Sequence, residues 1–252
     1  MEREWLSECA SLLGNEEPNE LPEPFNLATP QSRCPSCQRR IGALENIPII
    51  SYIVLGRKCR GCKKPISARY PLVEFTSGLV AVVVAVKFGF GAAFCGALGL
   101  SWSLVVLAAI DIDTQLLPDS ITLPLLWAGI VANYFGLFVS LEEAVLGAIF
   151  GYLTLWSIFW MFKLATGKDG MGYGDFKLLA VLGAWLGWQV LPVVVVLSSV
   201  VGAAFGISMI LFSSHDKSKP IPFGPYLAVA GWIALLWGDE ITNQYLFGSS
   251  GL

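Results

Sequence analysis

Long apolar segments separated by short polar turns are the feature that most constrains how this chain can fold. From residue 71 onward the sequence is almost continuously apolar, and seven such segments can be distinguished. A helix needs roughly 20 residues to cross the apolar core of a bilayer. We therefore expect about seven transmembrane helices, near residues 71–89, 92–112, 120–139, 143–163, 175–188, 190–212 and 222–238.

The overall composition agrees with a membrane protein. Of the 252 residues, 55% are hydrophobic and only 14% are charged, whereas about a quarter of the residues of a soluble domain are charged. The polar residues are concentrated before the first apolar segment. We predict an all-α polytopic membrane protein with two domains: a small N-terminal cytoplasmic region at residues 1–70 and a transmembrane domain at residues 71–252.

The distribution of basic residues predicts how the helices are oriented. Nine lysines and arginines crowd the stretch just before the first apolar segment, and basic residues of cytoplasmic loops orient membrane proteins. If this stretch is cytoplasmic, alternation of the spans also puts the turns at Asp111 and Asp175 at the cytoplasmic face. The nine residues are Arg33, Arg39, Arg40, Arg57, Lys58, Arg60, Lys63, Lys64 and Arg69.

Two aspartates stand at the ends of apolar segments. Asp111 follows SLVVLAAI, and Asp175 precedes FKLLAVLGAWLG. Ionisable residues at such positions are rare and usually functional. Two adjacent carboxyl groups can share one proton, so that one activates water while the other polarises a carbonyl group. The only histidine, His215, lies in a charged loop, which gives little support to a histidine-based triad.

Each aspartate also has a simpler interpretation. Asp175 could cap a helix, because aspartate is favoured at the N-cap, and we expect this capping role for Asp119. Asp113 could be a solvated turn residue. Residues two apart on a helix point about 200° away from each other, so only one of Asp111 and Asp113 should face a partner. Asp111 is the better candidate because it lies nearer the apolar segment.

Three glycines precede the second aspartate, in the stretch GMGYGD. Gly170, Gly172 and Gly174 occupy alternate positions, which a simple helix cap does not require. Glycine permits backbone conformations and close approaches that other residues do not. We expect a flexible loop that carries Asp175 and admits the backbone of a substrate.

Four cysteines of the N-terminal region form two C-x-x-C pairs. Cys34 and Cys37 are separated by twenty-one residues from Cys59 and Cys62. This spacing predicts a tetrahedral zinc site, which should be structural because cysteines fill all four ligand positions. Cys9 and Cys95 have no evident partners. The surrounding basic residues favour contact with anionic lipid over binding of nucleic acid.

Several stretches together resemble the bacterial type IV prepilin leader peptidases over essentially the whole chain. They are CPSC…CRGC, AAIDIDTQLLPDSITLPLLW, GMGYGDFKLLAVLGAWLG and IPFGPYLA. The resemblance implies a G-x-G-D intramembrane aspartyl protease of the bacterial inner membrane, with Asp111 and Asp175 as its catalytic residues. Such an enzyme removes the basic leader from prepilins and type II secretion pseudopilins after a glycine, at the cytoplasmic face. It also N-methylates the new N-terminal residue with S-adenosylmethionine.

One difference from the family and two rival functions stay open at this point. Family members usually begin with a further apolar segment that carries a G-S-F-x-N-type motif, and we expect this chain to lack it. The aspartates could instead serve a proton- or cation-coupled transporter. The chain could also be an inactive assembly scaffold that acts through its zinc region.

Overall fold

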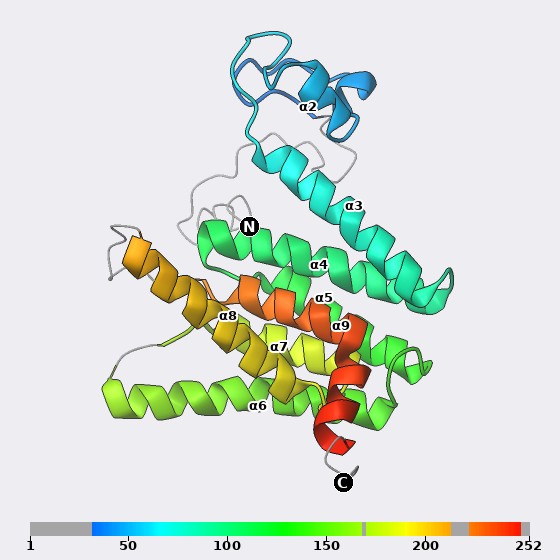
Figure 1. Cartoon of the computed structure of the whole chain (residues 1–252), viewed down its shortest axis with the longest axis vertical. Coiled ribbons are helices and arrows are strands. Elements are labelled where there is room, and N and C mark those ends of the chain that lie inside the picture. The colour runs from blue at the N-terminus through cyan, green and yellow to red at the C-terminus, as the bar shows by residue number, and fades with distance from the viewer. Residues whose placement is uncertain (1–31, 168–169, 213–221, 248–252) are drawn as a thin grey trace, which may run out of the picture. The chain divides into compact units, whose positions relative to one another are not determined.

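The structure is a computed structural model that describes residues 32–167, 170–212 and 222–247 (Figure 1). Contacts divide the chain into two units, Met1–Phe75 and Thr76–Leu252, and each is described by itself. The domain boundary expected after residue 70 stays a prediction. Two residues used in the sequence arguments lie outside the described ones, namely Cys9 and His215.

The N-terminal unit contains little regular structure. Its two short helical elements are η1 (Ala43–Asn46) and α2 (Ile50–Val54). Isolated bridges join Arg33 to Arg40 and Lys58 to Pro65, so that each C-x-x-C pair lies in a turn closed by one bridge. The two turns are therefore local hairpin-like structures that present thiols.

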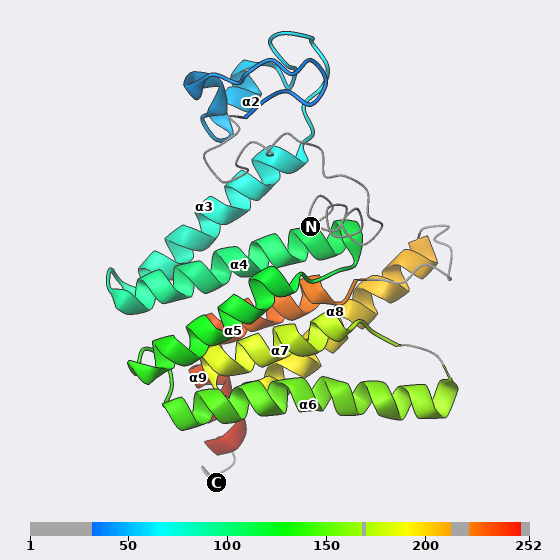
Figure 2. The same cartoon turned by 180° about the vertical axis from the view of Figure 1, so that it is seen from behind.

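All seven apolar segments form helices, and the described residues contain no β-strand. This confirms the predicted all-α fold. Figures 1 and 2 show these helices from opposite sides. They are α3 (Arg69–Phe88), α4 (Ala92–Thr114), α5 (Asp119–Tyr134), α6 (Leu141–Thr166), α7 (Tyr173–Leu186), α8 (Leu191–Phe212) and α9 (Gly224–Phe247).

The helices differ in their capacity to cross a membrane. Four are long and apolar enough to do so: α3, α4, α6 and the Leu191–Ser208 part of α8. The other three predicted spans are helical, but their apolar parts are shorter than those of the four spanning helices. Helix α5 has 16 residues and α7 has 14, and the apolar part of α9 is Gly224–Gly238. The chain is therefore a membrane protein with both full-length and short apolar helices.

Helix α7 forms the centre of the second unit. It packs against α6, α5 and α9, and Figures 1 and 2 show it lying alongside α6. Every residue from Phe176 to Leu186 except Lys177 is buried. A helix that is apolar on all sides must lie within a protein core or in lipid, and here other helices surround it. This is why a helix as short as α7 does not need to span the bilayer alone.

Helices α6 and α7 approach each other through glycines. A Cβ atom added to Gly183 would overlap the carbonyl group of Gly147, and one added to Gly151 would lie 2.5 Å from the carbonyl oxygen of Leu179. Gly147 and Gly151 form the G-x-x-x-G stretch GAIFG. Without a hydrophobic driving force in lipid, helices associate through small residues that let their backbones pack closely. The glycines therefore hold α7 against α6.

Polar side chains of α5 hold the other end of α7. The buried amide of Asn133 donates to the carbonyl oxygens of Ala184 and Trp185, over 2.8 and 3.0 Å. Its own oxygen accepts from the backbone N–H groups of Phe138 and Val139, both over 3.1 Å. The final carbonyls of a helix have no partner within it. Asn133 thus satisfies carbonyl groups that would otherwise be buried without hydrogen bonds.

The predicted end of the third apolar segment was wrong by several residues. We expected it to reach residue 139, but α5 ends at Tyr134. Gly136 adopts the left-handed conformation, with φ of 69°. Such a glycine after a helix commonly terminates it.

We expect Gly183→Ala to reduce thermal stability. Overpacking a close interior contact typically costs about 1–3 kcal/mol, and here the obstruction is backbone that has no alternative rotamer. The melting temperature of the detergent-purified chain, followed by tryptophan fluorescence, measures the change. Gly99→Ala in α4 is the matched control, since nothing lies within 4 Å of the added carbon. Equal melting temperatures for both variants would contradict the proposed role of the glycine contact.

Candidate active site and cysteine cluster

Asp111 lies in the last turn of α4, on the side of the helix that faces the protein interior. Only 5% of its surface is exposed, whereas Asp113 is exposed. This difference follows from helix geometry, because positions two apart point to nearly opposite sides. The burial agrees with the preference for Asp111 over Asp113, while its catalytic role stays a prediction.

Asp175 is the third residue of α7 and is also buried, with 6% of its surface exposed. The N-cap of α7 is Gly172, so the interpretation of Asp175 as the capping residue was wrong. The charge of Asp111 acts on Asp175, which means that the two carboxyl groups lie within electrostatic range. The fold thus brings together two acids that are 64 positions apart in the sequence.

A backbone group from a third helix contacts Asp111. The N–H of Gly224, at the start of α9, donates to Oδ2 of Asp111 over 3.0 Å. A Cβ atom at position 224 would lie 2.6 Å from the same oxygen. The start of a helix carries partial positive charge, so α9 directs both a donor and a favourable dipole toward Asp111. We had noted the stretch IPFGPYLA only for its resemblance and had not predicted this contact.

Two of the three glycines before Asp175 lie in close contact with neighbouring side chains. A Cβ atom on Gly174 would lie 2.8 Å from Cβ of Leu117, and one on Gly170 would lie 2.8 Å from the ring of Phe162. Gly174 lies inside α7, so the predicted loop ends earlier than we expected. Tight contacts with neighbouring side chains therefore explain two of the three glycines.

Asp119 does not cap α5, contrary to our prediction. The N-cap is Pro118, and no side chain caps this helix. Instead, Nζ of Lys177 on α7 donates to both carboxylate oxygens of Asp119, over 2.6 and 2.7 Å. The ion pair could not be read from local sequence, because its members are 58 positions apart.

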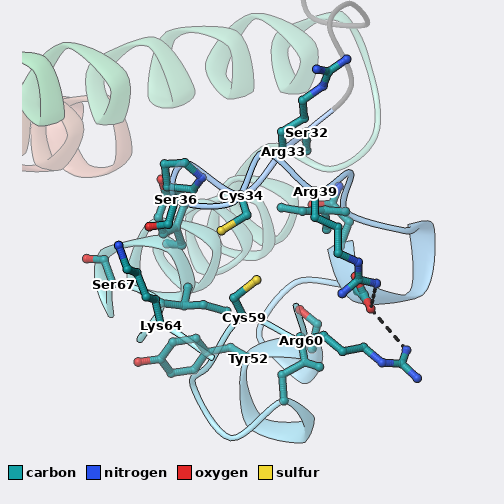
Figure 3. A pocket seen from close by; sticks show the side chains of 18 of the residues that line it. Ser32, Arg33, Cys34, Ser36, Arg39, Tyr52, Cys59, Arg60, Lys64 and Ser67 are labelled. Atoms are coloured by element: carbon teal, nitrogen blue, oxygen red, sulfur yellow. Dashed lines mark hydrogen bonds and ion pairs between the residues drawn. The ribbon is translucent and has the colours of Figure 1, made fainter. Parts of the chain in front are cut away.

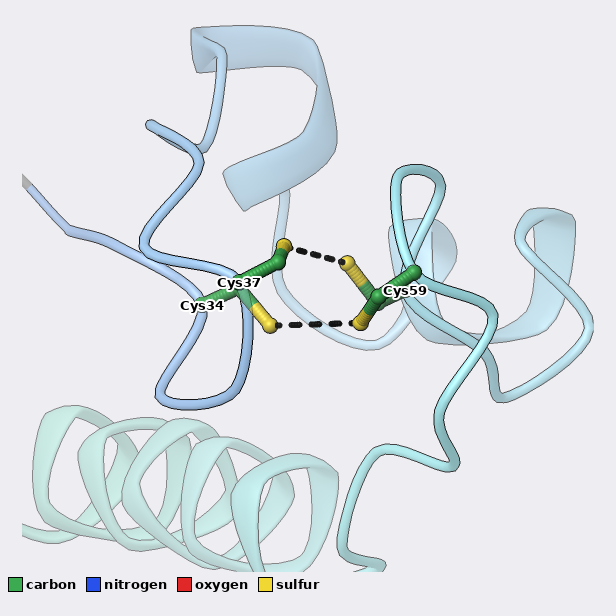
Figure 4. Close-up of side chains that lie close together, drawn as sticks. Cys34, Cys37 and Cys59 are labelled. Carbon is green, nitrogen blue, oxygen red and sulfur yellow. Dashed lines mark hydrogen bonds between the residues drawn. The ribbon is translucent and has the colours of Figure 1, made fainter.

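The four cysteines of the N-terminal unit form one cluster, as predicted. Their sulfur atoms all lie within 4.8 Å of one another. The Cys34–Cys62 and Cys37–Cys59 sulfurs are 3.8 and 4.0 Å apart (Figure 4). Tetrahedral ligands at a zinc–sulfur distance of about 2.3 Å would be separated by about 3.8 Å. These separations exclude disulfides, which join sulfurs at about 2 Å, and fit a metal ion.

The electrostatics of the thiols also favour a cation. Backbone N–H groups of Cys37 and Ser36 lower the pKa of Cys34 to about 6. The pKa of Cys62 is raised to about 11: the backbone of Lys64 lowers it, but burial and hydrogen bonds with the other three thiols outweigh that effect. One thiolate therefore forms easily, whereas four neighbouring thiolates need a bound metal ion to offset their repulsion.

A cavity of about 590 Å³, lined by apolar as well as charged residues, adjoins this cluster within the N-terminal unit (Figure 3). Arg39 and Arg60 both donate to Oε1 of Glu45, over 2.9 and 3.2 Å. The hydrogen bond from Arg39 is the main reason that the pKa of Glu45 lies below its usual value. Small-molecule sites have volumes of roughly 300–1,000 Å³. Because Glu45 already pairs with two arginines, the other basic residues of the lining give the cavity a cationic character.

The fold and the site define a helical membrane protein that has two buried, interacting aspartates and a four-cysteine cluster. A sequence model of the type IV leader peptidase family matches residues 98–207, and one of the bacterial peptidase A24 N-terminal domain matches residues 14–88. The chain belongs to this family of peptidases, as its resemblance implied.

Curated relatives named prepilin leader peptidase/N-methyltransferase support this membership. The relative from Aeromonas hydrophila is 58% identical over 246 residues, which cover 98% of this chain and 85% of the relative. One from Pseudomonas aeruginosa is 56% identical, with coverage of 98% and 84%. One from Burkholderia pseudomallei is 49% identical, with coverage of 94% and 77%. No solved structure matches the chain significantly.

We expect one tightly bound metal ion per chain. Elemental analysis of protein purified without added metal should find it, and Cys59→Ser should lower the metal content by at least about tenfold, because one of four thiolate ligands is lost. Cys95→Ser is the matched control, since Cys95 is a free cysteine outside the cluster. Equal metal content in the two variants would contradict a site formed by the cluster.

Proposed function

We propose that this chain removes the basic leader peptide from type IV prepilins and type II secretion pseudopilins. Cleavage follows a glycine at the cytoplasmic face of the bacterial inner membrane. The same chain then N-methylates the newly exposed N-terminal residue. Family membership and the names of the curated relatives support the reaction class.

The observation that carries the peptidase proposal is the pair of buried carboxyl groups. Asp111 and Asp175 are 5% and 6% exposed, come from separate helices and interact electrostatically. Burial disfavours ionisation of both groups at once, so the pair holds one proton between them. This is the charge state that an aspartic peptidase requires.

The proposed reaction needs only this pair and water. The ionised carboxylate accepts a proton from water as its oxygen attacks the scissile carbonyl carbon, and the protonated carboxyl group donates to the carbonyl oxygen. The tetrahedral intermediate then collapses: the carboxyl group that took a proton from water donates it to the leaving nitrogen, the C–N bond breaks, and a hydroxyl group of the intermediate returns a proton to the other carboxylate. The two carboxyl groups thereby return to their starting state with one shared proton.

The location of the site suits a membrane-anchored substrate. Asp111 lies in the last turn of α4 and Asp175 in the first turn of α7, so both acids belong to helix ends on the side that the basic residues predict to be cytoplasmic. A prepilin helix would enter laterally from the lipid with its basic leader in the cytoplasm. Membrane lipid is therefore a second partner, and the expectation that nucleic acid is not one stays a prediction.

Methylation requires S-adenosylmethionine, which supplies a methyl group to the new terminal amine. The cavity of the N-terminal unit is our candidate for its binding site, because its volume of about 590 Å³ lies in the range of small-molecule sites. Arg40 and Lys64 would bind the carboxylate of the cofactor, and the ring of Tyr52 would contact its adenine. Zinc is the metal we propose for the four-cysteine cluster, in a structural role.

The rival functions have less support. The relatives described above carry peptidase names, and nothing in them favours an ion-coupled transporter. An inactive scaffold would not need two buried acids within electrostatic range. The aspartyl peptidase remains the function that the geometry supports best.

Replacing either acid tests the proposal. Asp111→Asn and Asp175→Asn should each abolish leader removal, because neither variant retains a pair of carboxyl groups that can share a proton. Mass spectrometry of a co-expressed prepilin reads leader loss and N-methylation in one spectrum. Asp113→Asn, which changes an exposed acid two positions away, should cleave normally. Retained processing in either buried-site variant would rule out the shared-proton mechanism.

Gly224→Ala should lower the cleavage rate by about 100-fold, since misplacing a catalytic group by about 1 Å can cost this much. The added carbon would lie 2.6 Å from Oδ2 of Asp111 and must displace the carboxyl group. The initial rate of prepilin cleavage in detergent gives the effect. Gly78→Ala, with open space around the added carbon, should retain the parent rate. A normal rate for Gly224→Ala would show that the contact does not position Asp111.

A further inference from the structure

We infer that the ion pair between Lys177 and Asp119 positions the two catalytic aspartates relative to each other. This inference rests on the proposed peptidase function and goes beyond it by assigning a role to two residues outside the carboxyl pair. Neither residue donates or accepts the protons of the reaction. They act by joining the two chain segments that carry Asp111 and Asp175.

The connectivity of the chain gives the pair this role. Asp111 lies in the last turn of α4 and Asp119 is the first residue of α5, so one short connection links them. Asp175 and Lys177 lie two residues apart near the start of α7. The ion pair therefore ties together the same two segments whose separation sets the distance between the carboxyl groups.

Helices α4 and α7 are joined through their neighbours α5 and α9, each of which packs against both. Helix α4 packs mainly against α9, whereas α7 packs mainly against α6 and α5. The two helices that carry the acids thus depend on their neighbours for their relative position. Asp111 is held from α9 by the N–H of Gly224. The first turn of α7 is held from the start of α5.

Two contacts join the start of α5 to the start of α7. Leu117, just before α5, packs so closely against Gly174 that a Cβ atom there would lie 2.8 Å from Cβ of Leu117. Lys177 then reaches both oxygens of Asp119, over 2.6 and 2.7 Å. An apolar contact alone lets the two helices slide past each other. A charged donor that contacts two oxygens also fixes the orientation of one helix relative to the other.

The direction of Lys177 argues against a direct role in proton transfer. Residues two apart on a helix point about 200° away from each other, so Lys177 and Asp175 lie on opposite sides of α7.

The ion pair itself is partly exposed to solvent. The side chain of Lys177 is 28% exposed and that of Asp119 is 55% exposed. Exposed ion pairs contribute little to overall stability. Loss of the pair should therefore reduce catalytic activity far more than thermal stability.

The test compares single substitutions with a charge exchange. Lys177→Met and Asp119→Asn should each lower kcat for prepilin cleavage by about 10- to 100-fold, in line with the cost of misplacing a catalytic group. KM should stay within about twofold, because substrate binding does not use the pair. The double variant Asp119→Lys with Lys177→Asp restores opposite charges at both positions and should recover at least about a third of the parent kcat, since complementary partners show their coupling in such cycles.

A second ion pair of the same unit supplies the matched control. Nζ of Lys87 lies 2.6 Å from Oε1 of Glu240, with side-chain exposures of 36% and 60%. This pair joins α3 to the C-terminal part of α9, sixteen positions after Gly224, and contacts neither acid. Lys87→Met should keep both kcat and KM at parent values. The melting temperature of every variant should stay close to that of the parent.

Four results would overturn the inference. Parent-like kcat in Lys177→Met would show that the pair does not position the acids, while inactive Asp175→Asn would still support the proposed function. A raised KM with unchanged kcat would assign Lys177 to substrate binding. A double variant no more active than the singles would remove the case for pairing. A parent chain that does not cleave prepilin would refute both the proposed function and the inference.

Discussion

The close contact between the backbones of α6 and α7 is the interaction on which the rest of the membrane unit depends. Gly147 and Gly183 meet with no room for a side chain on either. Apolar surface alone does not drive helices together in lipid. This contact must therefore depend on the close fit of the two backbones at their glycines. It draws a helix of only 14 residues into the protein interior, where α5 and α9 cover its other sides. The first turn of that helix carries Asp175.

Burial of α7 creates a demand for hydrogen bonds that polar residues of α5 meet. Asn133 satisfies the carbonyls of Ala184 and Trp185 at one end, and the indole N–H of Trp185 donates to the carbonyl of Leu125 over 2.9 Å. At the other end of α7, Lys177 finds its partner in Asp119. These contacts fix the helix along its length and thereby hold the carboxyl group of Asp175 in place.

Local patterns in the sequence were enough to predict the helices, the cysteine cluster and two candidate acids. Long apolar segments can satisfy their backbone in lipid only as helices, and all seven became helical. The C-x-x-C pairs predicted a cluster because each pair is closed by its own short turn. The preference for Asp111 over Asp113 needed only the periodicity of a helix. The helix caps were less predictable. Aspartate is favoured at an N-cap, yet the N-caps of α5 and α7 are Pro118 and Gly172.

The sequence by itself thus determined which segments form apolar helices, which family the chain resembles and which residues could perform its chemistry. Those properties depend on composition and on spacing over a few turns. Only the tertiary structure decided that Gly224 contacts Asp111, that Lys177 pairs with Asp119 and that two of the loop glycines serve close packing. Such contacts join segments many positions apart, and their partners are selected by the packing of whole helices, which no local pattern encodes.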